Sequence, residues 1–235
     1  MTISVPSKII FASSNKNKIK EIIALLPESI ILKGLQDIGI THEIPEPGTT
    51  IKENSFLKAK YVIDFLKDKS ISVFADDSGL EVEALNNAPG VYSARYAGFD
   101  HQSLGEGGKA KNDEANNKKL LHELKNFTNR KAKFVTVITL ITDLFPDSQL
   151  TAAELDEAWR GDLGEKLQVF YFEGQIKGTI AFEPRGTSGF GYDPLFIPQG
   201  YRSTFAELGA EVKNTISHRA IAVKKLIEFL EKVKS

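Results

Sequence analysis

The fold class follows first from one segment near the N-terminus, Lys8-Ile9-Ile10-Phe11-Ala12-Ser13-Ser14-Asn15. Residues 8–12 form an apolar run, which predicts a strand buried on both faces. Residues 13–15 break this strand, and apolar residues at helical spacing then continue as far as Pro27. A strand, a short polar turn and a helix form the opening of an α/β unit, so we expect an α/β protein.

Patterns further along the chain predict the remaining elements. A capping-box pattern at Thr50-Ile51-Lys52-Glu53 predicts the start of a second helix. Strands are predicted at residues 70–75, 80–84, 133–142, 167–172 and 178–182, the last two joined by a turn, and helices at residues 113–124, 151–159 and 217–232. Because no Pro/Ser-rich linker divides the chain, we expect residues 1–235 to form one continuous domain.

The composition excludes several classes of protein. With 30 Lys and Arg against 31 Asp and Glu, the chain lacks the basic excess of a general nucleic-acid binder. The absence of cysteine excludes disulfide frameworks, thiolate zinc sites, iron–sulfur clusters and cysteine nucleophiles. No apolar run is long enough to span a bilayer, and residues 1–6 lack the features of a signal peptide. We therefore expect a soluble, cytoplasmic protein without nucleic-acid or membrane partners.

Two polar segments follow apolar runs and carry candidate chemistry. The segment Ser13-Ser14-Asn15-Lys16-Asn17-Lys18 opens a helix, where backbone N–H groups and lysine charge favour phosphate; the alternative is ordinary helix capping. The segment Asp76-Asp77-Ser78-Gly79 ends an apolar strand, where two carboxylates suit Mg²⁺ or a base that orients water; the alternative is an Asx-type turn. Because neighbours in a strand point to opposite faces, one Asp would be catalytic and the other structural.

Two further segments are unusual for simple packing. Residues 184–194 hold three glycines within six residues together with Phe190 and Tyr192, which favours close backbone approach to a ligand and stacking on a base. Lys213 precedes Ser217-His218-Arg219, which opens the last helix. Basic residues in a first helical turn oppose the helix dipole unless an anion or a keto oxygen lies nearby. The alternatives are a plain loop and an ordinary helix start.

Together these segments resemble the Ham1 family of inosine triphosphate pyrophosphatases. The resemblance extends from about Ile9 to Leu226 and rests on five motifs, at residues 11–18, 74–80, 89–96, 189–194 and 217–219. It implies an elongated, mixed α/β fold with two lobes and helices flanking a central cleft. It also implies hydrolysis of non-canonical purine nucleoside triphosphates (ITP, dITP and XTP) to the monophosphate and pyrophosphate with Mg²⁺. Such proteins are typically cytosolic homodimers, and this activity cleanses the nucleotide pool.

The resemblance also assigns roles to individual residues. It implies that Asp77 is the proton acceptor and, together with Glu46, the ligand of Mg²⁺. The residues expected to contact the substrate are Ser13, Ser14, Asn15, Lys16, Asn17 and Lys18 at the triphosphate, Ser78 and Lys213, and Phe190, Gly191, Tyr192, Asp193, His218 and Arg219 at the base. An Arg219 that donates to the C6 oxygen and an Asp193 that accepts from N1–H would favour hypoxanthine and xanthine over adenine.

The sequence departs from the family pattern in length. Residues 98–112 and 143–166 are longer than expected, and the second insertion is acidic. Ile176 also stands where the family often has an aromatic residue. Two other functions stay open, a Maf-type nucleotide pyrophosphatase and a non-catalytic nucleotide-binding module. The Ser217-His218-Arg219 helix opening argues against the first, and the acids Glu46 and Asp77 argue against the second.

Overall fold

The computed structural model describes residues 8–66, 72–98, 112–143 and 167–232. Its elements, in chain order, are β1 (Lys8–Phe11), α1 (Lys16–Leu25), β2 (Ile31–Lys33), η1 (Gln36–Ile38), α2 (Ile51–Phe65), β3 (Ser72–Val82), η2 (Glu83–Leu85), η3 (Gly90–Arg95), α3 (Asp113–Glu123), β4 (Lys131–Thr142), β5 (Gln168–Ile180), β6 (Phe196–Pro198), α4 (Phe205–Ile216) and α5 (His218–Lys232). None of the helices within these ranges combines the length and the apolar character that a membrane crossing requires.

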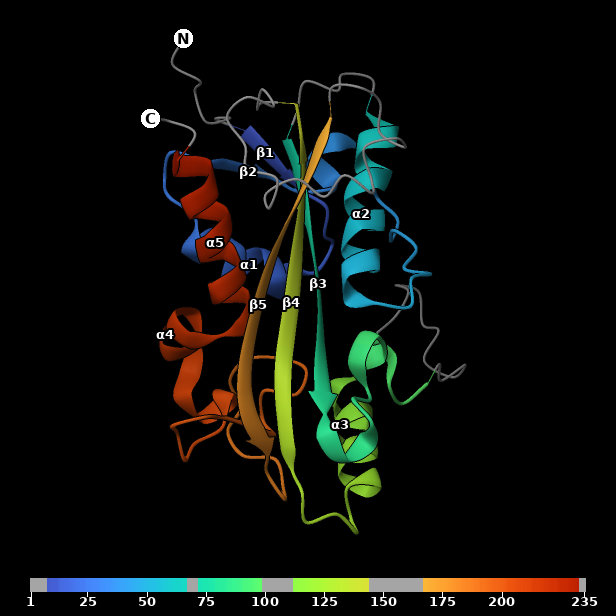
Figure 1. Cartoon of the computed structure of the whole chain (residues 1–235), viewed down its shortest axis with the longest axis vertical. Coiled ribbons are helices and arrows are strands. Elements are labelled where there is room, and N and C mark those ends of the chain that lie inside the picture. Colours follow the sequence, from blue (N-terminus) through green and yellow to red (C-terminus); the bar gives the residue numbers. More distant parts are fainter. Residues whose placement is uncertain (1–7, 67–71, 99–111, 144–166, 233–235) are drawn as a thin grey trace. The chain divides into compact units, whose positions relative to one another are not determined.

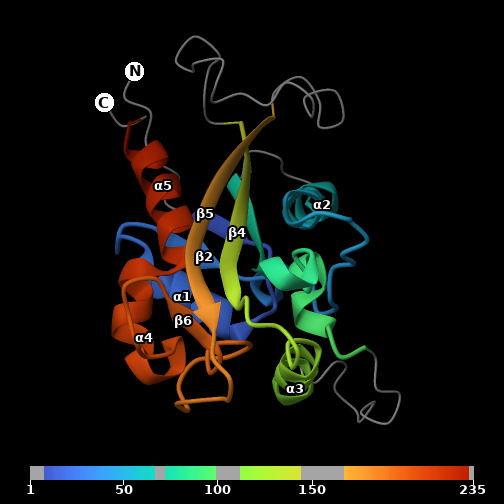
Figure 2. The same ribbon diagram turned by 60° about the horizontal axis from the view of Figure 1, so that its bottom comes forward.

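The strands of the described ranges form one 6-stranded mixed sheet in the order β2-β1-β3-β4-β5-β6. Figure 1 labels β1 to β5, and Figure 2 labels β6. Strand β1 pairs in parallel with β2 and with β3, placing Ile10 opposite both Lys33 and Val73. Strand β5 pairs antiparallel with β6 over Gly178–Ile180. The predicted α/β class with a mixed sheet and flanking helices is therefore confirmed.

The chain divides into two compact units. Unit 1 consists of Met1–Asp77, Thr136–Gly174 and Arg219–Ser235, and unit 2 consists of Ser78–Val135 and Gln175–His218. The long strands β3, β4 and β5 each contribute residues to both units.

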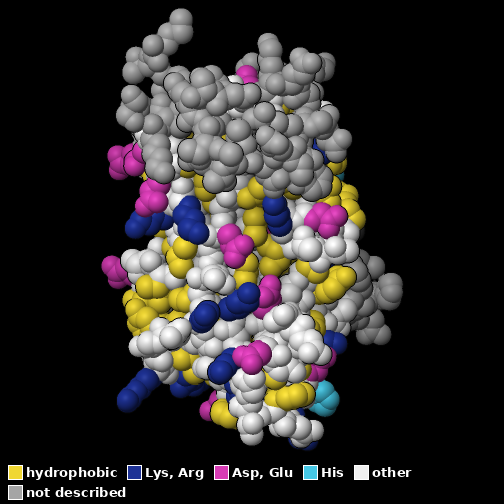
Figure 3. Space-filling view, in the orientation of Figure 1, with side chains coloured by type: hydrophobic (Ala, Val, Ile, Leu, Met, Phe, Trp, Pro, Cys, Tyr) yellow, Lys and Arg dark blue, Asp and Glu magenta, His cyan; other side chains and the backbone are white. Residues whose placement is uncertain are grey.

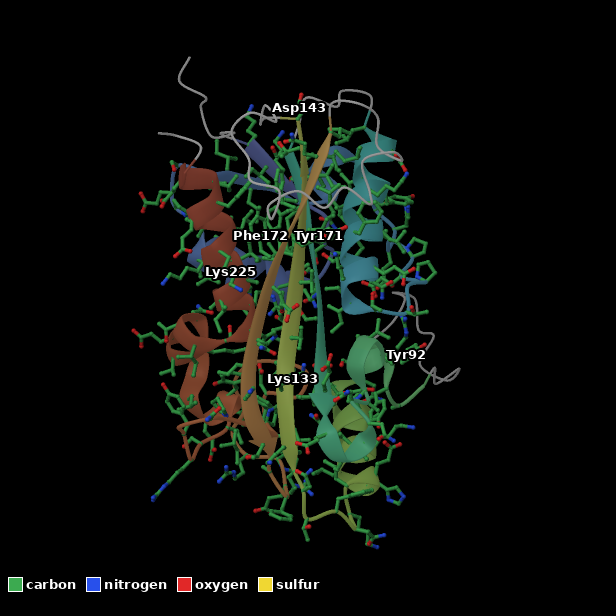
Figure 4. All side chains as sticks on the ribbon, viewed as in Figure 1. Tyr92, Lys133, Asp143, Tyr171, Phe172 and Lys225 are labelled. Carbon is green, nitrogen blue, oxygen red and sulfur yellow. The ribbon has the colours of Figure 1, made fainter. Side chains whose placement is uncertain are left out.

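The sheet of unit 1 separates two apolar clusters because alternate strand residues point to opposite faces. Figures 1 and 2 show α2 on one side of these strands and α5 on the other. Side chains on the α2 side include Ile10, Val73, Ala75, Phe56, Ala59 and Val62. Those on the opposite side include Ile9, Phe11, Phe74, Ile22, Val223 and Leu226, from β1, β3, α1 and α5. Tyr171 and Phe172, successive residues of β5, divide between the two clusters in the same way (Figure 4).

Unit 2 has one apolar cluster of its own. It joins the end of β3 and the start of β4 to α3, β6 and α4 through Leu80, Leu120, Phe134, Phe196 and Phe205. Figure 2 shows α3 and α4 on opposite sides of the strands in this part of the chain. The cluster fixes α3 relative to the strands, and α3 in turn donates to and accepts from the backbone of Gly191.

The sequence prediction of two short strands around Asp76–Gly79 is wrong. Strand β3 continues without a break from Ser72 to Val82, so Asp76 and Asp77 lie in its interior rather than beyond its carboxyl end. The alternative interpretation of residues 76–79, an Asx-type turn, is wrong for the same reason. Strand β3 lies between β1, which pairs with Ser72–Phe74, and β4, its neighbour on the other side. Backbone pairing within a sheet favours an extended strand over a turn.

The prediction of two strands joined by a turn at residues 173–177 is also wrong, because β5 is continuous from Gln168 to Ile180. A side chain at Gly178 would collide with the carbonyl oxygen of Ile197 in β6. The glycine therefore marks a close approach of two strands and not a turn.

Some elements were missed from the sequence and others lie outside the described residues. The short strands β2 and β6 and helix α4 were not predicted. Helix α4 begins with a complete capping box, in which Thr204 and Glu207 exchange hydrogen bonds. The predicted helix at residues 151–159 lies outside the described residues, and so does almost all of the insertions at 98–112 and 143–166.

Candidate active site

Asp76 and Asp77 point to opposite faces of β3, as the sequence predicted. Asp76 contacts Lys18 of α1 and Arg219 of α5, whereas Asp77 contacts Lys58 of α2. Together with Glu21 and Glu46, these residues form what we call the charged group of unit 1. Its carboxylates and cations alternate, so nearly every buried charge has an opposite charge beside it.

Asp76 is completely buried between two cations. The Lys18 Nζ lies 3.0 Å from its Oδ1, and the Arg219 Nε lies 3.1 Å from its Oδ2. Burial alone would raise the pKa of Asp76, but Lys18 and Arg219 hold that pKa well below its ordinary value. Arg219 also donates to Glu21 through Nη1. This side of β3 is therefore a fully satisfied, buried ion-pair network.

Burial has the opposite consequence for Lys18. It lowers the pKa of the Lys18 ammonium from 10.5 to about 8, although Asp76 acts to raise it. A lysine in this state loses its charge at mildly alkaline pH, which makes any function that needs the charge pH-dependent.

The second face of β3 carries a different arrangement. Lys58 Nζ donates to Glu46 Oε1 over 2.8 Å and to Asp77 Oδ1 over 3.1 Å. Burial alone would lower the pKa of Lys58, but Asp77 and Glu46 raise it above its ordinary value. Burial raises the pKa of Asp77 above its ordinary value, although Lys58 acts to lower it. Two carboxylates thus converge on one ammonium.

Glu46 and Asp77 fit the expected Mg²⁺ in their donor chemistry. Magnesium takes oxygen ligands and is commonly bound through one or two carboxylates together with substrate phosphates and waters. Both carboxylates already face one cationic atom, the Lys58 ammonium. Among the described residues, no group of three or more His, Cys, Asp and Glu side chains could hold a metal by itself. A metal held here would need further ligands from substrate or water.

The start of α1 shows the capping that was the alternative to phosphate binding. Asn15 Oδ1 accepts hydrogen bonds from the backbone N–H groups of Asn17 and Lys18, at 3.0 and 3.4 Å. Ser14, Lys16 and Asn17 are exposed. The Nδ2 group of Asn15 is buried, and it has no hydrogen-bond partner within the part of the chain that the structure describes. Capping and anion binding are compatible here, because Asn15 caps the helix through Oδ1 and its Nδ2 group can donate to an anion at the helix N-terminus.

In unit 2, residues 189–193 form what we call the aromatic loop. Asp193 Oδ2 accepts from Lys213 Nζ over 2.5 Å and from the Phe190 N–H over 2.8 Å. The Lys213 ammonium also lies 4.5 Å from the centre of the Phe190 ring. Gly189 has a φ of +83°, and a side chain there would collide with the Asp193 carboxylate. Contacts within the loop therefore require a glycine at position 189 and an acceptor at Asp193.

Other parts of unit 2 hold the remaining residues of this loop. The Gly191 N–H donates to Asp113 Oδ2 over 2.7 Å, and Asn117 Nδ2 donates to the Gly191 carbonyl over 3.0 Å. The Tyr192 hydroxyl donates to the Ser93 carbonyl over 2.9 Å. His218 is buried, with its ring stacked on Phe134 at 4.6 Å between centroids. These contacts leave little conformational freedom to the loop.

The predicted site residues therefore divide between the units. Lys18, Glu46, Asp77 and Arg219 come together in the charged group, whereas Phe190–Asp193, Lys213 and His218 belong to unit 2. Ser78, next to Asp77, is also assigned to unit 2. The structure places the Arg219 guanidinium against Asp76 and Glu21, and its predicted contact with a base stays a prediction.

Sequence reasoning missed Glu21, Lys58, Asp113 and Asn117. A signal was present for Lys58, because it lies one residue before Ala59 and three after Ser55, on the face of α2 that is otherwise buried. A lysine on such a face needs a buried anion as a partner. No local pattern identified Asp113 or Asn117, since both act on a residue more than 70 positions away.

On the face shown in Figure 3, basic and acidic side chains are interspersed rather than gathered into a basic patch. The cations of the charged group, Lys18, Lys58 and Arg219, are instead largely withdrawn from solvent.

Comparisons with known proteins agree with one another. A model of the Ham1 family matches residues 9–229. The dITP/XTP pyrophosphatase of Flavobacterium johnsoniae is 45% identical over 227 residues, which cover 97% of this chain and 100% of that protein. The protein of the same name from Porphyromonas gingivalis is 45% identical over 95% of this chain and 97% of its own length. The solved Ham1 protein of Staphylococcus aureus has a TM-score of 0.73 at 37% identity, covering 96% of this chain and 98% of that one.

Proposed function

Since this chain belongs to the Ham1 family, we propose that it hydrolyses non-canonical purine nucleoside triphosphates to the nucleoside monophosphate and pyrophosphate. The substrates are ITP, dITP and XTP, and the protein is a hydrolase that acts on acid anhydrides. Its activity removes such nucleotides from the nucleotide pool.

One observation carries this proposal, the convergence of Glu46 and Asp77 on Lys58 beside the Lys18–Asp76 pair. A nucleoside triphosphate brings about four negative charges, and phosphoryl chemistry depends mainly on positioning and charge stabilisation. Lys18 and Lys58 supply positive charge on the two faces of one strand, and Asp77 supplies a carboxylate beside it. No covalent nucleophile is needed for this chemistry.

The proposed reaction needs only water and the residues of the charged group, with Mg²⁺ bound. The oxygen of a water molecule attacks the α-phosphorus, and the bond from that phosphorus to the oxygen bridging toward the β-phosphorus breaks. Asp77 accepts the proton of the attacking water. Lys18 and Lys58 offset the charge that pyrophosphate carries away. Asp76 and Glu21 hold Arg219 and Lys18 in place and take no proton.

We assign Glu46 and Asp77 as the residues that hold Mg²⁺, because both offer carboxylate oxygens toward one cationic position. When bound, Mg²⁺ supplies Lewis-acid stabilisation of charge on the phosphate oxygens. Lys58 keeps these two carboxylates together and limits the repulsion between them.

We assign recognition of the base to the aromatic loop and to His218 or Arg219. Phe190 supplies aromatic surface, and the buried Tyr192 anchors the loop in the apolar cluster of unit 2. Asp193 and Lys213 set the shape of the loop. His218 and Arg219 are both candidate donors to the C6 oxygen of hypoxanthine or xanthine. Adenine presents an amino group at C6, which would leave such a donor unpaired. The ratio of kcat/KM for ITP to that for ATP, measured in His218→Ala and Arg219→Ala, identifies the donor.

We also propose a cytoplasmic homodimer. The expectation comes from the family resemblance, and Tyr92 of η3 supports it because this aromatic side chain is 54% exposed (Figure 4). Light scattering at micromolar concentration tests the dimer. A mass near 26.0 kDa, that of one chain, would contradict the dimer. A mass twice as large would support it, provided that Tyr92→Asp lowers the mass toward that of one chain.

Pyrophosphate release from ITP, measured with and without Mg²⁺, tests the proposed function. We expect release from ITP and XTP that depends on Mg²⁺ and far exceeds release from ATP. Binding of ITP without release of pyrophosphate would contradict the enzymatic proposal and favour a nucleotide-binding module. Release that is equal for ITP and ATP would contradict the base preference.

A further inference from the structure

Helix α3 holds one residue of the aromatic loop from both sides. The Gly191 N–H donates to the Asp113 carboxylate over 2.7 Å, and the Gly191 carbonyl accepts from the Asn117 amide over 3.0 Å. These two backbone groups belong to successive peptide units, one leading to Phe190 and one leading to Tyr192. Fixing both peptide planes therefore fixes the directions in which the two aromatic residues leave the backbone.

The conformation held in this way is one that needs support. Gly191 has a φ of +62°, in the left-handed region. The hydrogen bonds to its backbone come from Asp113 and Asn117 of α3. The rest of the loop is held at other residues, for example by the bonds between Phe190 and Asp193, between Lys213 and Asp193 and between Tyr192 and Ser93. Because glycine is conformationally permissive, the bonds from Asp113 and Asn117 select one of several accessible conformations.

Asn117 keeps its bond to Gly191 at a cost. Its side-chain oxygen is buried and has no partner among the residues that the structure describes. A buried acceptor without a partner destabilises a fold, whereas a leucine of similar size would avoid this penalty. Turning the amide over would place its oxygen against the Gly191 carbonyl. Packing alone therefore gives no reason for an asparagine at this position.

We propose that Asp113 and Asn117 are positioning residues for base selectivity, which set the aromatic loop by clamping the backbone of Gly191. This inference rests on the proposed function, because it assigns the loop to recognition of the purine base. Neither residue touches the reacting atoms. Their effect is on which base is accepted, and the chemistry at the phosphates, which depends on Lys18, Lys58 and Asp77, is left intact.

The test compares Asp113→Ala, Asn117→Leu and the milder Asp113→Asn with the wild-type protein. The ratio of kcat/KM for ITP to that for ATP should fall by about tenfold or more in Asp113→Ala, since a bond to a charged acceptor is lost. The fall should lie mainly in KM, with kcat for ITP within about threefold. Asp113→Asn keeps an acceptor oxygen and should restore most of the ratio.

The matched control is Glu114→Gln, which changes the same charge one position along α3. Glu114 is exposed and pairs only with Lys118 in the contacts described, so its ratio should equal that of the wild type. Inhibition by tripolyphosphate, which lacks a base, should be equal in all variants. Amide hydrogen exchange at Gly191 should accelerate in Asp113→Ala and in Asn117→Leu.

The outcomes separate the clamp from the proposed function. An unchanged ITP-to-ATP ratio in folded Asp113→Ala and Asn117→Leu overturns the clamp, and so does a parallel loss of kcat and tripolyphosphate binding. If Asp113→Ala does not fold, Asn117→Leu and Asp113→Asn decide by the same two readouts. A wild-type protein that does not hydrolyse ITP overturns the proposed function instead.

Discussion

The charged group of unit 1 and the aromatic loop of unit 2 position their side chains by different physical means. In the charged group, Asp76 and Asp77 come from β3, Lys18 from α1 and Lys58 from α2, so the sheet and helices fix their spacing. The aromatic loop has no regular structure, and side-chain hydrogen bonds to its backbone determine its shape. Under the proposed function, phosphate chemistry would thus depend on regular elements, whereas base recognition would depend on a few side-chain contacts to a loop.

This difference has a consequence for how each region responds to substitution. Removing a charge from the charged group should damage catalysis or stability severely, because nearly every charge in it is buried against an opposite one. Removing a contact from the aromatic loop should alter preference more than rate. The four predictions below test this contrast.

The largest effect is expected for Asp77→Asn. The amide cannot accept a proton from water, so kcat for pyrophosphate release should fall by at least about 10²-fold. Circular dichroism should show a native fold, since Lys58 keeps its bond to Glu46. Asp64→Asn is the control, because Asp64 pairs with Lys60 on the surface of α2 and should leave activity unchanged. Near-normal activity in folded Asp77→Asn would remove Asp77 from the mechanism.

Asp76→Asn should show the reverse balance of stability and activity. Its carboxylate is buried between Lys18 and Arg219, and breaking a buried ion pair costs about 3–5 kcal/mol. Urea denaturation should therefore show a loss of about 3 kcal/mol in the free energy of unfolding. We expect kcat to fall by no more than about tenfold, much less than for Asp77→Asn. Equal losses of kcat in the two variants would contradict the division of roles across β3.

The pH dependence should report on Lys18. Burial lowers the pKa of Lys18 to about 8, and its charge is present below that pH and lost above it. The value of kcat/KM for ITP should therefore fall as pH rises through about 8, by up to roughly tenfold per pH unit. Lys18→Arg should flatten this limb, because a guanidinium stays charged. Lys20→Arg, an exposed change in the same helix, should keep the wild-type pH profile. If kcat/KM of Lys18→Arg still falls above pH 8, a group other than Lys18 causes the fall.

The smallest effect is expected for Phe134→Leu in unit 2. This substitution removes the stacking partner of His218 and should cost about 1 kcal/mol of stability. If His218 contacts the base, KM for ITP should rise by about two- to threefold, since a loss below 1 kcal/mol corresponds to this range. Phe170→Leu in unit 1 is the control, with a similar loss of stability and an unchanged KM. Equal KM shifts in both variants would argue against a role for His218.

The sequence by itself determined much of the local structure. Apolar runs identified β1 and β4, and caps at Asn15 and Thr50 match the starts of α1 and α2. The two-residue period of a strand also required Asp76 and Asp77 to point to opposite faces, because this follows from backbone geometry alone. The ordered motifs identified the family without any knowledge of the fold.

Only the tertiary structure decided how these pieces are joined. Strands β3 and β5 run through residues whose local preference is for turns, because pairing with neighbouring strands outweighs that preference. The partners of the buried charges, Lys58 for Glu46 and Asp77 and Glu21 for Arg219, lie 12 to 198 residues away along the chain. The clamp of Asp113 and Asn117 on Gly191 spans 78 and 74 residues. Such contacts depend on packing between distant elements, and no local sequence pattern encodes them.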